Sequence, residues 1–206
     1  MLIARRRKAN NGEEQGHRLF AAVWERIGRS RADVRKQTAG KARGRVLEIG
    51  AGTGFNFNFY GEQTERVVAT EPDPFMLRRA RSRAEAADVE VEVQQASAED
   101  LPFEDESFDT VVGTWVACSF KDPAKAFSEI RRVLKPGGEL RFQEHVRSEN
   151  SLVALGQDMM TPLTRLLGAG CHHNRETLRY MREAGFELER IEKVSVMEVE
   201  GVAVRV

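Results

Sequence analysis

Along residues 44–145, short apolar runs alternate with longer segments in which apolar residues recur at helical spacing. Short apolar runs bounded by glycine or proline are typical of buried strands. Five such runs predict strands: residues 44–50, 65–72, 89–95, 107–116 and 139–145. Two amphipathic segments between them predict helices, one over 74–87 with Pro74 in its first turn and one over 122–138 that stops at Pro136.

This alternation of strand and helix predicts an α/β protein with a mainly parallel sheet and helices on both faces. Residues 186–194 and 199–206 add two strands as an antiparallel C-terminal hairpin, which makes a Rossmann-like sheet of seven strands. Such sheets bind ligands at the carboxyl ends of their strands, near the reversal in strand order. Five groups of residues fall at that edge: Glu48–Gly54, Glu71, Ser97–Glu99, Gly113–Thr114 and Glu144–His145.

Two segments outside the alternation predict how this edge is covered. Residues 1–43 begin with a basic arm and have helical spacing over 13–38, so we predict an arm and a helix that covers the active site. Residues 44–206 are predicted to form one domain. Within it, residues 150–172 are an insertion rich in apolar side chains and methionine, which predicts a flexible lid over a hydrophobic substrate.

Composition narrows the class of protein. The chain has 206 residues, enough for one domain with a full core, and its formal net charge of +0 gives no electrostatic reason to expect a nucleic-acid partner. Its two cysteines, Cys118 and Cys171, are too few for a disulfide framework and indicate a reducing compartment. No signal peptide follows the basic N-terminus, and no apolar run approaches the ~20 residues of a membrane helix, so a cytoplasmic protein is expected.

The glycine turn in "VLEIGAGTG" (residues 46–54) contains the most specific chemistry. A P-loop is excluded because no lysine follows Gly54, and the G-x-G-x-x-G of a dinucleotide site is not met from Gly50 or from Gly52. The acid before the turn, Glu48, would repel a pyrophosphate but suits a ligand with an ammonium or sulfonium group.

A second acid, Glu71, closes the next strand, where ribose hydroxyls are bound in Rossmann-type sites. A carboxylate accepts both hydroxyl hydrogens. A cofactor with a ribose, a positive centre and no phosphate is S-adenosylmethionine, and we therefore expect this cofactor at the turn.

Four motifs stand in a known order: "VLEIGAGTG", "ATEPDPFML", "SAEDLPFEDESFDTVV" and "EIRRVLKPGGEL". In their order and spacing the chain resembles class I S-adenosylmethionine-dependent methyltransferases over roughly residues 44–145. The resemblance implies a set of cofactor-binding residues: Glu48, Gly50, Ala51, Gly52, Gly54, Glu71, Pro72, Ser97, Ala98, Glu99 and Thr114. Within that set Glu71 would hold the ribose, Ala98 and Glu99 would flank the adenine, and Thr114 would lie under the cofactor. Ser97 departs from the pattern, because many relatives have aspartate there.

Three further stretches, "GTWVACSFKD", "FQEHVRSE" and "GCHHNRETL", are similar to one branch of this family. The branch holds membrane-associated alkyl-thiol methyltransferases of animals and small bacterial relatives. The animal proteins carry an N-terminal hydrophobic anchor, whereas this chain has "MLIARRRKANNGEEQG" there. Membrane anchoring is therefore not carried over.

His145 is the candidate general base because it follows the fifth strand at the active edge, and Glu144 is the candidate residue to orient it. The alternative is that His145 only caps the strand end. The stretch "CHHNRE" at 171–176 invites a metal site, but adjacent residues rarely converge on one ion, so no metal is predicted. Cys171 is expected to pack, and Asn174 to cap a helix.

Three functions remain open. The first is methyl transfer to a small hydrophobic acceptor such as a thiol. The second is methyl transfer to a lipid or quinone at a membrane surface, with weak peripheral contact through the basic N-terminal segment. The third is a non-catalytic protein that binds S-adenosylmethionine. The oligomeric state is not predicted.

Overall fold

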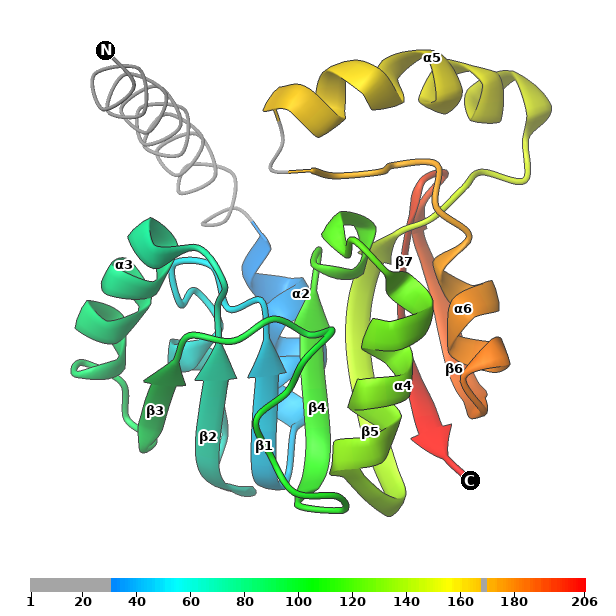
Figure 1. Ribbon diagram of the computed structural model, residues 1–206. Helices are drawn as coiled ribbons and strands as arrows, with labels where there is room; N and C mark the ends of the chain where they lie inside the picture. Colours follow the sequence, from blue (N-terminus) through cyan, green and yellow to red (C-terminus); the bar gives the residue numbers. More distant parts are fainter. Residues whose placement is uncertain (1–30, 168–169) are drawn as a thin grey trace, which may run out of the picture.

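The computed structural model describes residues 31–167 and 170–206 (Figure 1). Of the helix predicted over 13–38, the described part contains α2 (Ala32–Gln37). The basic arm and the rest of that helix, with its predicted role as a cover of the active site, lie outside the described residues. Figure 1 places α2 behind the sheet.

Seven strands form one sheet in the order β3-β2-β1-β4-β5-β7-β6. Their bounds are β1 Gly44–Ile49, β2 Thr64–Thr70, β3 Val91–Gln94, β4 Phe108–Thr114, β5 Leu134–His145, β6 Phe186–Ser195 and β7 Glu198–Arg205. The first five pair in parallel, whereas β7 pairs antiparallel with both β5 and β6. The predicted α/β fold with an antiparallel C-terminal hairpin is confirmed.

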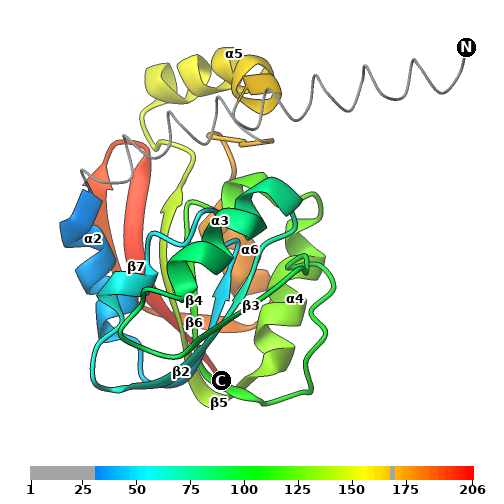
Figure 2. The same ribbon diagram turned by 90° about the vertical axis from the view of Figure 1, so that its left-hand side faces the viewer.

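The two faces of the sheet bury separate apolar clusters, because neighbouring residues of a strand point to opposite faces. One cluster joins Leu47 and Val111 to residues of α4 (Pro123–Val133) and α6 (Thr177–Glu183). The other joins Val46 and Val112 to Ala80 of α3 (Pro74–Ala84) and to η2 (Ala39–Lys41). Figure 2 shows the two groups of helices on opposite sides of the strands. Strands covered on both faces read as continuous apolar runs, and the central strands β2 and β4 show this pattern.

Helix starts agree with the sequence better than helix ends. The Asp73 carboxylate accepts hydrogen bonds from the amides of Phe75 and Met76 at the start of α3, and Asp122 accepts from Lys125 at the start of α4. The helix predicted over 122–138 ends at Val133, and β5 follows without a loop. Since proline breaks the helical hydrogen bonding and Gly137 has a φ of 71°, the "KPGG" stretch belongs to the strand.

The insertion after β5 forms α5 (Ser151–Leu167), which lies across the carboxyl ends of the strands in both ribbon views (Figures 1 and 2). One helix runs through both Gly156 and Pro162, residue types that disfavour the interior of a helix. Its apolar side chains are exposed, with Leu152 at 81% and Met159 at 74% of full exposure. No helix among the described residues has the length and apolarity needed to cross a membrane.

Polar contacts tie α5 to the segments beneath it. Gln157 is buried, and its amide donates to the backbone oxygens of Val146 (2.9 Å) and His173 (2.6 Å). Arg147 makes a two-pronged ion pair with Asp158, at 2.6 and 2.9 Å. These bonds lie on the side of α5 opposite the exposed apolar residues. The role of the insertion as a lid remains a prediction.

Candidate active site

The turn after β1 has the backbone conformation that its glycines allow. Gly50, Gly52 and Gly54 all have positive φ, at 59°, 58° and 81°. A Cβ atom on Gly50 would come 2.1 Å from a methyl group of Val116, and one on Gly54 would come 2.5 Å from the ring of Phe57. At Gly52 a Cβ would meet nothing within 4 Å. Two of the glycines are thus required by packing, and the third borders open space in which a ligand can approach the backbone.

Glu71 lies beside this open space, just after β2. Its carboxylate accepts hydrogen bonds from the amide of Gly52 (2.8 Å) and the amide of Asp73 (2.9 Å), one on each oxygen. Burial raises its pKa, although the two amide hydrogen bonds oppose the shift. Each carboxylate oxygen can accept a second bond, so the group has capacity left for two hydroxyls. Gly52 and Glu71, 19 residues apart in sequence, are brought into contact as predicted.

From the sequence, Glu48 was expected to offer its charge directly to a positively charged ligand. In the structure its carboxylate is bound by protein side chains. Its carboxylate is 2% exposed and accepts from Tyr60 Oη (2.6 Å) and Asn56 Nδ2 (2.9 Å). The Arg35 guanidinium donates in turn to the Asn56 side-chain oxygen. Glu48 therefore joins β1 to the segment after the glycine turn. Neither Asn56 nor Tyr60 was predicted from the sequence, because the apolar residues between them dominate the pattern of that segment.

Burial raises the pKa of Glu48 to about 7, from an ordinary value of 4.5. The folded chain thus binds this proton more tightly than the unfolded chain does. The resulting stability is fully present below pH 4.5 and is lost as pH rises through about 7. A shift of this size corresponds to about 3 kcal/mol in the free energy of unfolding.

We therefore expect Glu48→Gln to remove the part of the pH dependence of stability that the Glu48 carboxyl causes. Between pH 5 and pH 8 the variant should gain about 2–3 kcal/mol in free energy of unfolding relative to the parent protein, because it has no carboxyl group to ionise there. Urea denaturation at both pH values measures this gain, with Glu62→Gln, at an exposed position, as the control. A constant difference between variant and parent across this range would show that Glu48 ionises freely.

The remaining predicted cofactor residues line the same edge of the sheet. The Ser97 hydroxyl donates to the Glu99 carboxylate, which also accepts from the amide of Lys121 at 2.8 Å. Burial opposes the charged form of Glu99, but these hydrogen bonds outweigh it and hold its pKa below the usual value. Thr114 accepts from Asn56 Nδ2 at 3.1 Å, and the Pro72 carbonyl accepts from Gln95 Nε2 at 3.0 Å.

These features fit S-adenosylmethionine. The open Cβ position at Gly52 leaves room against the backbone, and Glu71 offers carboxylate oxygens at the site expected for a ribose. Ala51 and Ala98 are small and buried beside the turn and after β3. The assignment of each residue to a part of the cofactor remains a prediction.

Glu144 and His145, the candidate catalytic pair, end β5 and are both buried. One oxygen of Glu144 accepts from the amides of Val116 and Ala117, each at 2.9 Å, and so fixes the start of η4 (Ala117–Ser119). Burial raises the pKa of Glu144 to about 7. Glu144 therefore supports the loop after β4, and the structure gives it no hydrogen bond to the His145 ring.

Both ring nitrogens of His145 face protein groups. Nε2 is 3.6 Å from Glu198 Oε1, and Nδ1 is 3.8 Å from Cys171 Sγ. Burial lowers the pKa of His145, but the contacts with Cys118, Glu144 and Glu198 outweigh it and raise the pKa overall. A role as base for an acceptor remains a prediction, and these contacts leave it no evident approach to one.

Cys118 and Cys171 lie side by side next to His145, with 3.0 Å between their sulfurs. Its contact with the Cys171 sulfur and its burial raise the pKa of Cys118 well above its usual range. From the sequence Cys171 alone was expected to pack. The fold instead places both thiols and one imidazole within 4.8 Å of one another.

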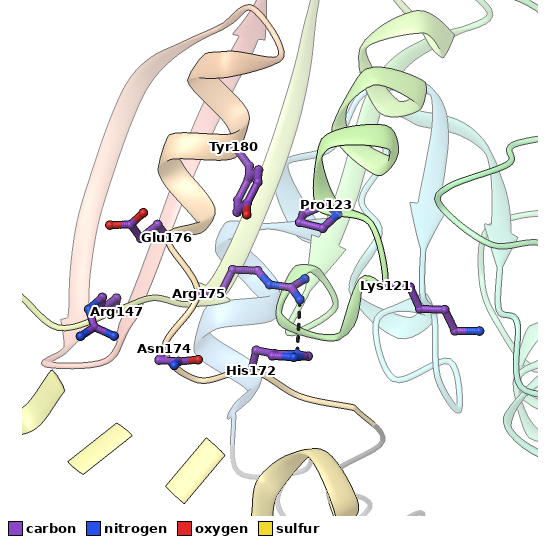
Figure 3. Close-up of a pocket in the computed structure, with 8 residues that line it drawn as sticks. All are labelled: Lys121, Pro123, Arg147, His172, Asn174, Arg175, Glu176 and Tyr180. Carbon is purple, nitrogen blue, oxygen red and sulfur yellow. Dashed lines mark hydrogen bonds between the residues drawn. The ribbon is translucent and has the colours of Figure 1, made fainter. Parts of the chain in front are cut away.

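A polar hollow lies between the start of α4 and the segment that leads into α6 (Figure 3). It is lined by Lys121, Pro123, Arg147, His172, Asn174, Arg175, Glu176 and Tyr180. Arg175 Nη2 donates to His172 Nδ1 at 3.3 Å, and Arg175 Nη1 donates to the Ala117 carbonyl at 2.6 Å. None of the predicted cofactor residues lines this hollow, so it is separate from the glycine turn.

The predicted N-cap at Asn174 is wrong. The helix α6 is preceded by Glu176, and no side chain caps it. Asn174 Nδ2 donates instead to Asp158 of α5, at 2.8 Å. Asparagine suits a turn as well as a cap, and here its amide links two segments that are distant in sequence.

Comparisons with known proteins agree with this geometry. A family model described as a methyltransferase domain matches residues 47–142. The thiol S-methyltransferase TMT1B of Homo sapiens is 36% identical over 152 residues, which are 72% of this chain and 62% of that protein. The chain thus spans less than two thirds of the length of this curated relative.

Solved structures are similar over most of the chain. The BH2331 protein of Bacillus halodurans C-125 has 30% identity and a TM-score of 0.67, over 78% of this chain and 70% of that one. The YcgJ protein of Bacillus subtilis has 26% identity and the same TM-score of 0.67, over 80% of this chain and 70% of that one.

Proposed function

We propose, from the premise that this chain belongs to the class I S-adenosylmethionine-dependent methyltransferases, that it methylates a small hydrophobic thiol. S-adenosylmethionine is the cofactor of this family, and S-adenosylhomocysteine is the product it leaves. The observation that carries the acceptor class is the 36% identity with a thiol S-methyltransferase over 72% of the chain. That match is longer than the methyltransferase-domain match over 47–142 and therefore includes residues beyond the cofactor-binding half.

When bound at the glycine turn, the cofactor supplies a methyl group already activated by a positively charged sulfur. The chain's own residues then have to hold and orient the reactants and exclude water. Glu71 would accept from the ribose hydroxyls, and the backbone around Gly52 would border the rest of the ligand. Ser97 donates to Glu99, whose lowered pKa favours a negative charge, and this carboxylate would lie near the adenine.

A thiol acceptor suits the surroundings of His145. A free thiol has a pKa of ~8.5, so a few per cent is thiolate at neutral pH without a protein base. One nitrogen of His145 faces Glu198 and the other faces Cys171. The acceptor thiol therefore loses its proton by its own ionisation in water, without a protein base.

We expect the pH dependence of turnover to follow the acceptor. With an aliphatic thiol the rate should rise with pH and level near that thiol's pKa, because the thiolate is the nucleophile. With an aromatic thiol of lower pKa it should level at a correspondingly lower pH. Initial rates of S-adenosylhomocysteine formation across pH 6–9.5 measure both profiles. An inflection at the same pH with every acceptor would instead assign the titration to a protein group such as His145.

A lipid or quinone acceptor at a membrane surface is the second candidate. The specific observation in its favour is a set of exposed apolar side chains on α5 and at the β6–β7 turn: Leu152, Leu155, Met159, Met160, Leu163, Val194, Val196 and Met197. Flotation with anionic vesicles separates the candidates, because binding that collapses in salt together with turnover of a quinol favours the membrane. Turnover of any acceptor excludes a purely cofactor-binding role.

A further inference from the structure

We propose that Cys118, His145 and Cys171 form a binding site for a thiophilic divalent cation, with Zn²⁺ the ion that its ligand types favour. The inference does not rest on the proposed methyl transfer. The three side chains come from η4, from the end of β5 and from the segment before α6. Each offers one ligand atom, and the three atoms lie within 4.8 Å of one another.

The separations are close to those of a zinc site. With Zn–S bonds of ~2.3 Å and Zn–N bonds of ~2.0 Å, tetrahedral geometry places two sulfurs ~3.8 Å apart and a sulfur and a nitrogen ~3.5 Å apart. The two sulfurs are 3.0 Å apart, and Cys171 Sγ is 3.8 Å from His145 Nδ1. Moving the sulfurs apart by less than about 1 Å, which a small side-chain rotation provides, brings this pair to the tetrahedral separation. The third pair, Cys118 with the imidazole, lies within 4.8 Å and would close up by a similar side-chain movement.

The imidazole is oriented as metal-binding histidines are. A ligating histidine usually donates its other ring N–H to a carboxylate, which fixes the tautomer. Here Nε2 faces Glu198 at 3.6 Å, and Nδ1 is directed toward the thiols. Glu198 is held in turn by Gln143 Nε2, at 3.3 Å, and by Arg31. This chain of contacts leaves the Nδ1 lone pair free for a cation.

The thiols are also held in place by bonds to the backbone around them. The Cys118 carbonyl accepts from the amide of His172 at 2.9 Å, and Glu144 holds the amides before it. Cys118 is 1% exposed, and His145 and Cys171 are each 8% exposed. Two thiolates and a neutral imidazole would balance a divalent charge in this buried position, whereas an uncompensated cation there would be costly.

The donor set indicates the ion. Thiolate and imidazole together suit zinc, whereas magnesium and calcium prefer oxygen. Three protein ligands with a fourth position for a non-protein ligand is the composition of catalytic zinc sites. The sequence-based objection concerned adjacent residues, but this set uses one member of "CHHNRE" and takes the others from elements 26 and 53 residues away.

Two other uses of these groups compete with the proposal. A reversible disulfide would join the two sulfurs, which are farther apart than the ~2.05 Å of that bond, and would give His145 no part. A general base at His145 would need Nδ1 or Nε2 to face the acceptor. A metal bound by both thiolates and Nδ1 excludes the disulfide and leaves only Nε2, which faces Glu198.

Metal binding by the full chain tests the proposal. Protein purified under reducing conditions and stripped with a chelator should bind about one equivalent of Zn²⁺, measured by elemental analysis after gel filtration. Co²⁺ in its place should give the near-ultraviolet absorption of cobalt–thiolate bonds. These two readouts need no variant and are independent of methyl transfer.

Variants then assign the ligands. Cys118→Ser, Cys171→Ser and His145→Ala should each weaken Zn²⁺ binding at least about 100-fold, and Glu198→Gln should weaken it about 10-fold or more, as for outer-shell partners. His172→Ala is the matched control and should bind as the parent does. Absence of zinc uptake and of cobalt–thiolate absorption in the reduced parent would overturn the proposal. So would a Cys118–Cys171 disulfide found by mass spectrometry in a chain that takes up no metal once reduced.

Discussion

Replacing Gly52 by valine is expected to weaken S-adenosylmethionine binding by more than about 100-fold while the protein still folds. The turn at Gly52 borders open space, so the new side chain would meet no protein atom within 4 Å of its Cβ and would occupy the ligand's approach to the backbone. The φ of 58° adds backbone strain of about 1–2 kcal/mol, which lowers stability without closing the site by itself. Calorimetric titration with S-adenosylhomocysteine measures the loss.

Gly137→Val is the matched control for this variant. Gly137 also has a positive φ, at 71°, and a Cβ there would likewise meet nothing within 4 Å. It lies near the amino end of β5, away from the cofactor edge. The control should lose a similar amount of stability and keep its affinity. Equal loss of affinity in both variants, or none in either, would remove the glycine turn from the site.

Glu71→Ala is expected to weaken the binding of both S-adenosylmethionine and S-adenosylhomocysteine by about 10–100-fold. The ribose would lose a charged acceptor, and hydrogen bonds to charged groups contribute about 1.5–3 kcal/mol. The amides of Gly52 and Asp73 would also lose their partner, which loosens the turn. Glu71→Gln should fall between parent and alanine variant, because it keeps one acceptor oxygen.

Glu92→Ala, an exposed acid on β3 that pairs with Arg66, serves as the control for the loss of one carboxylate. Its affinity for either ligand should equal that of the parent. Unchanged affinity in Glu71→Ala would mean that the acid after β2 only fixes the turn.

The sheet was predictable from the sequence because its strands are buried on both faces. Val46, Leu47 and Ile49 form a buried apolar run that only Glu48 interrupts, and the glycine turn marks where it ends. The end of α4 was predicted five residues late, at 138 rather than at Val133, since proline and glycine mark a break without saying whether a strand follows at once. The sequence does not show that 151–167 form one helix, because Gly156 and Pro162 disfavour helix and the polar contacts of Gln157 that hold α5 come from distant segments.

The candidate site was predictable only where one motif contains the chemistry. Gly52 and Glu71 follow the neighbouring strands β1 and β2. They meet because these two strands are parallel and end at the same edge of the sheet. The hydrogen bonds of Glu48 were not predictable, because its partners Tyr60 and Asn56 lie in the loop after the glycine turn. The sequence does not show the path of that loop. Cys118 and Cys171 are 53 residues apart, and no local pattern shows that they meet.

The acceptor is tested most directly by following the methyl group itself. The parent protein is incubated with S-adenosylmethionine labelled on its methyl carbon and with a panel of an aliphatic thiol, a phenol, a quinol and phosphatidylethanolamine, and Gly52→Val serves as the inactive control. We expect the label in the methyl thioether of the thiol, in equal amount to S-adenosylhomocysteine formed, and in no product with Gly52→Val. Label in the quinol or the phospholipid, with none in any thiol, would contradict the proposed function.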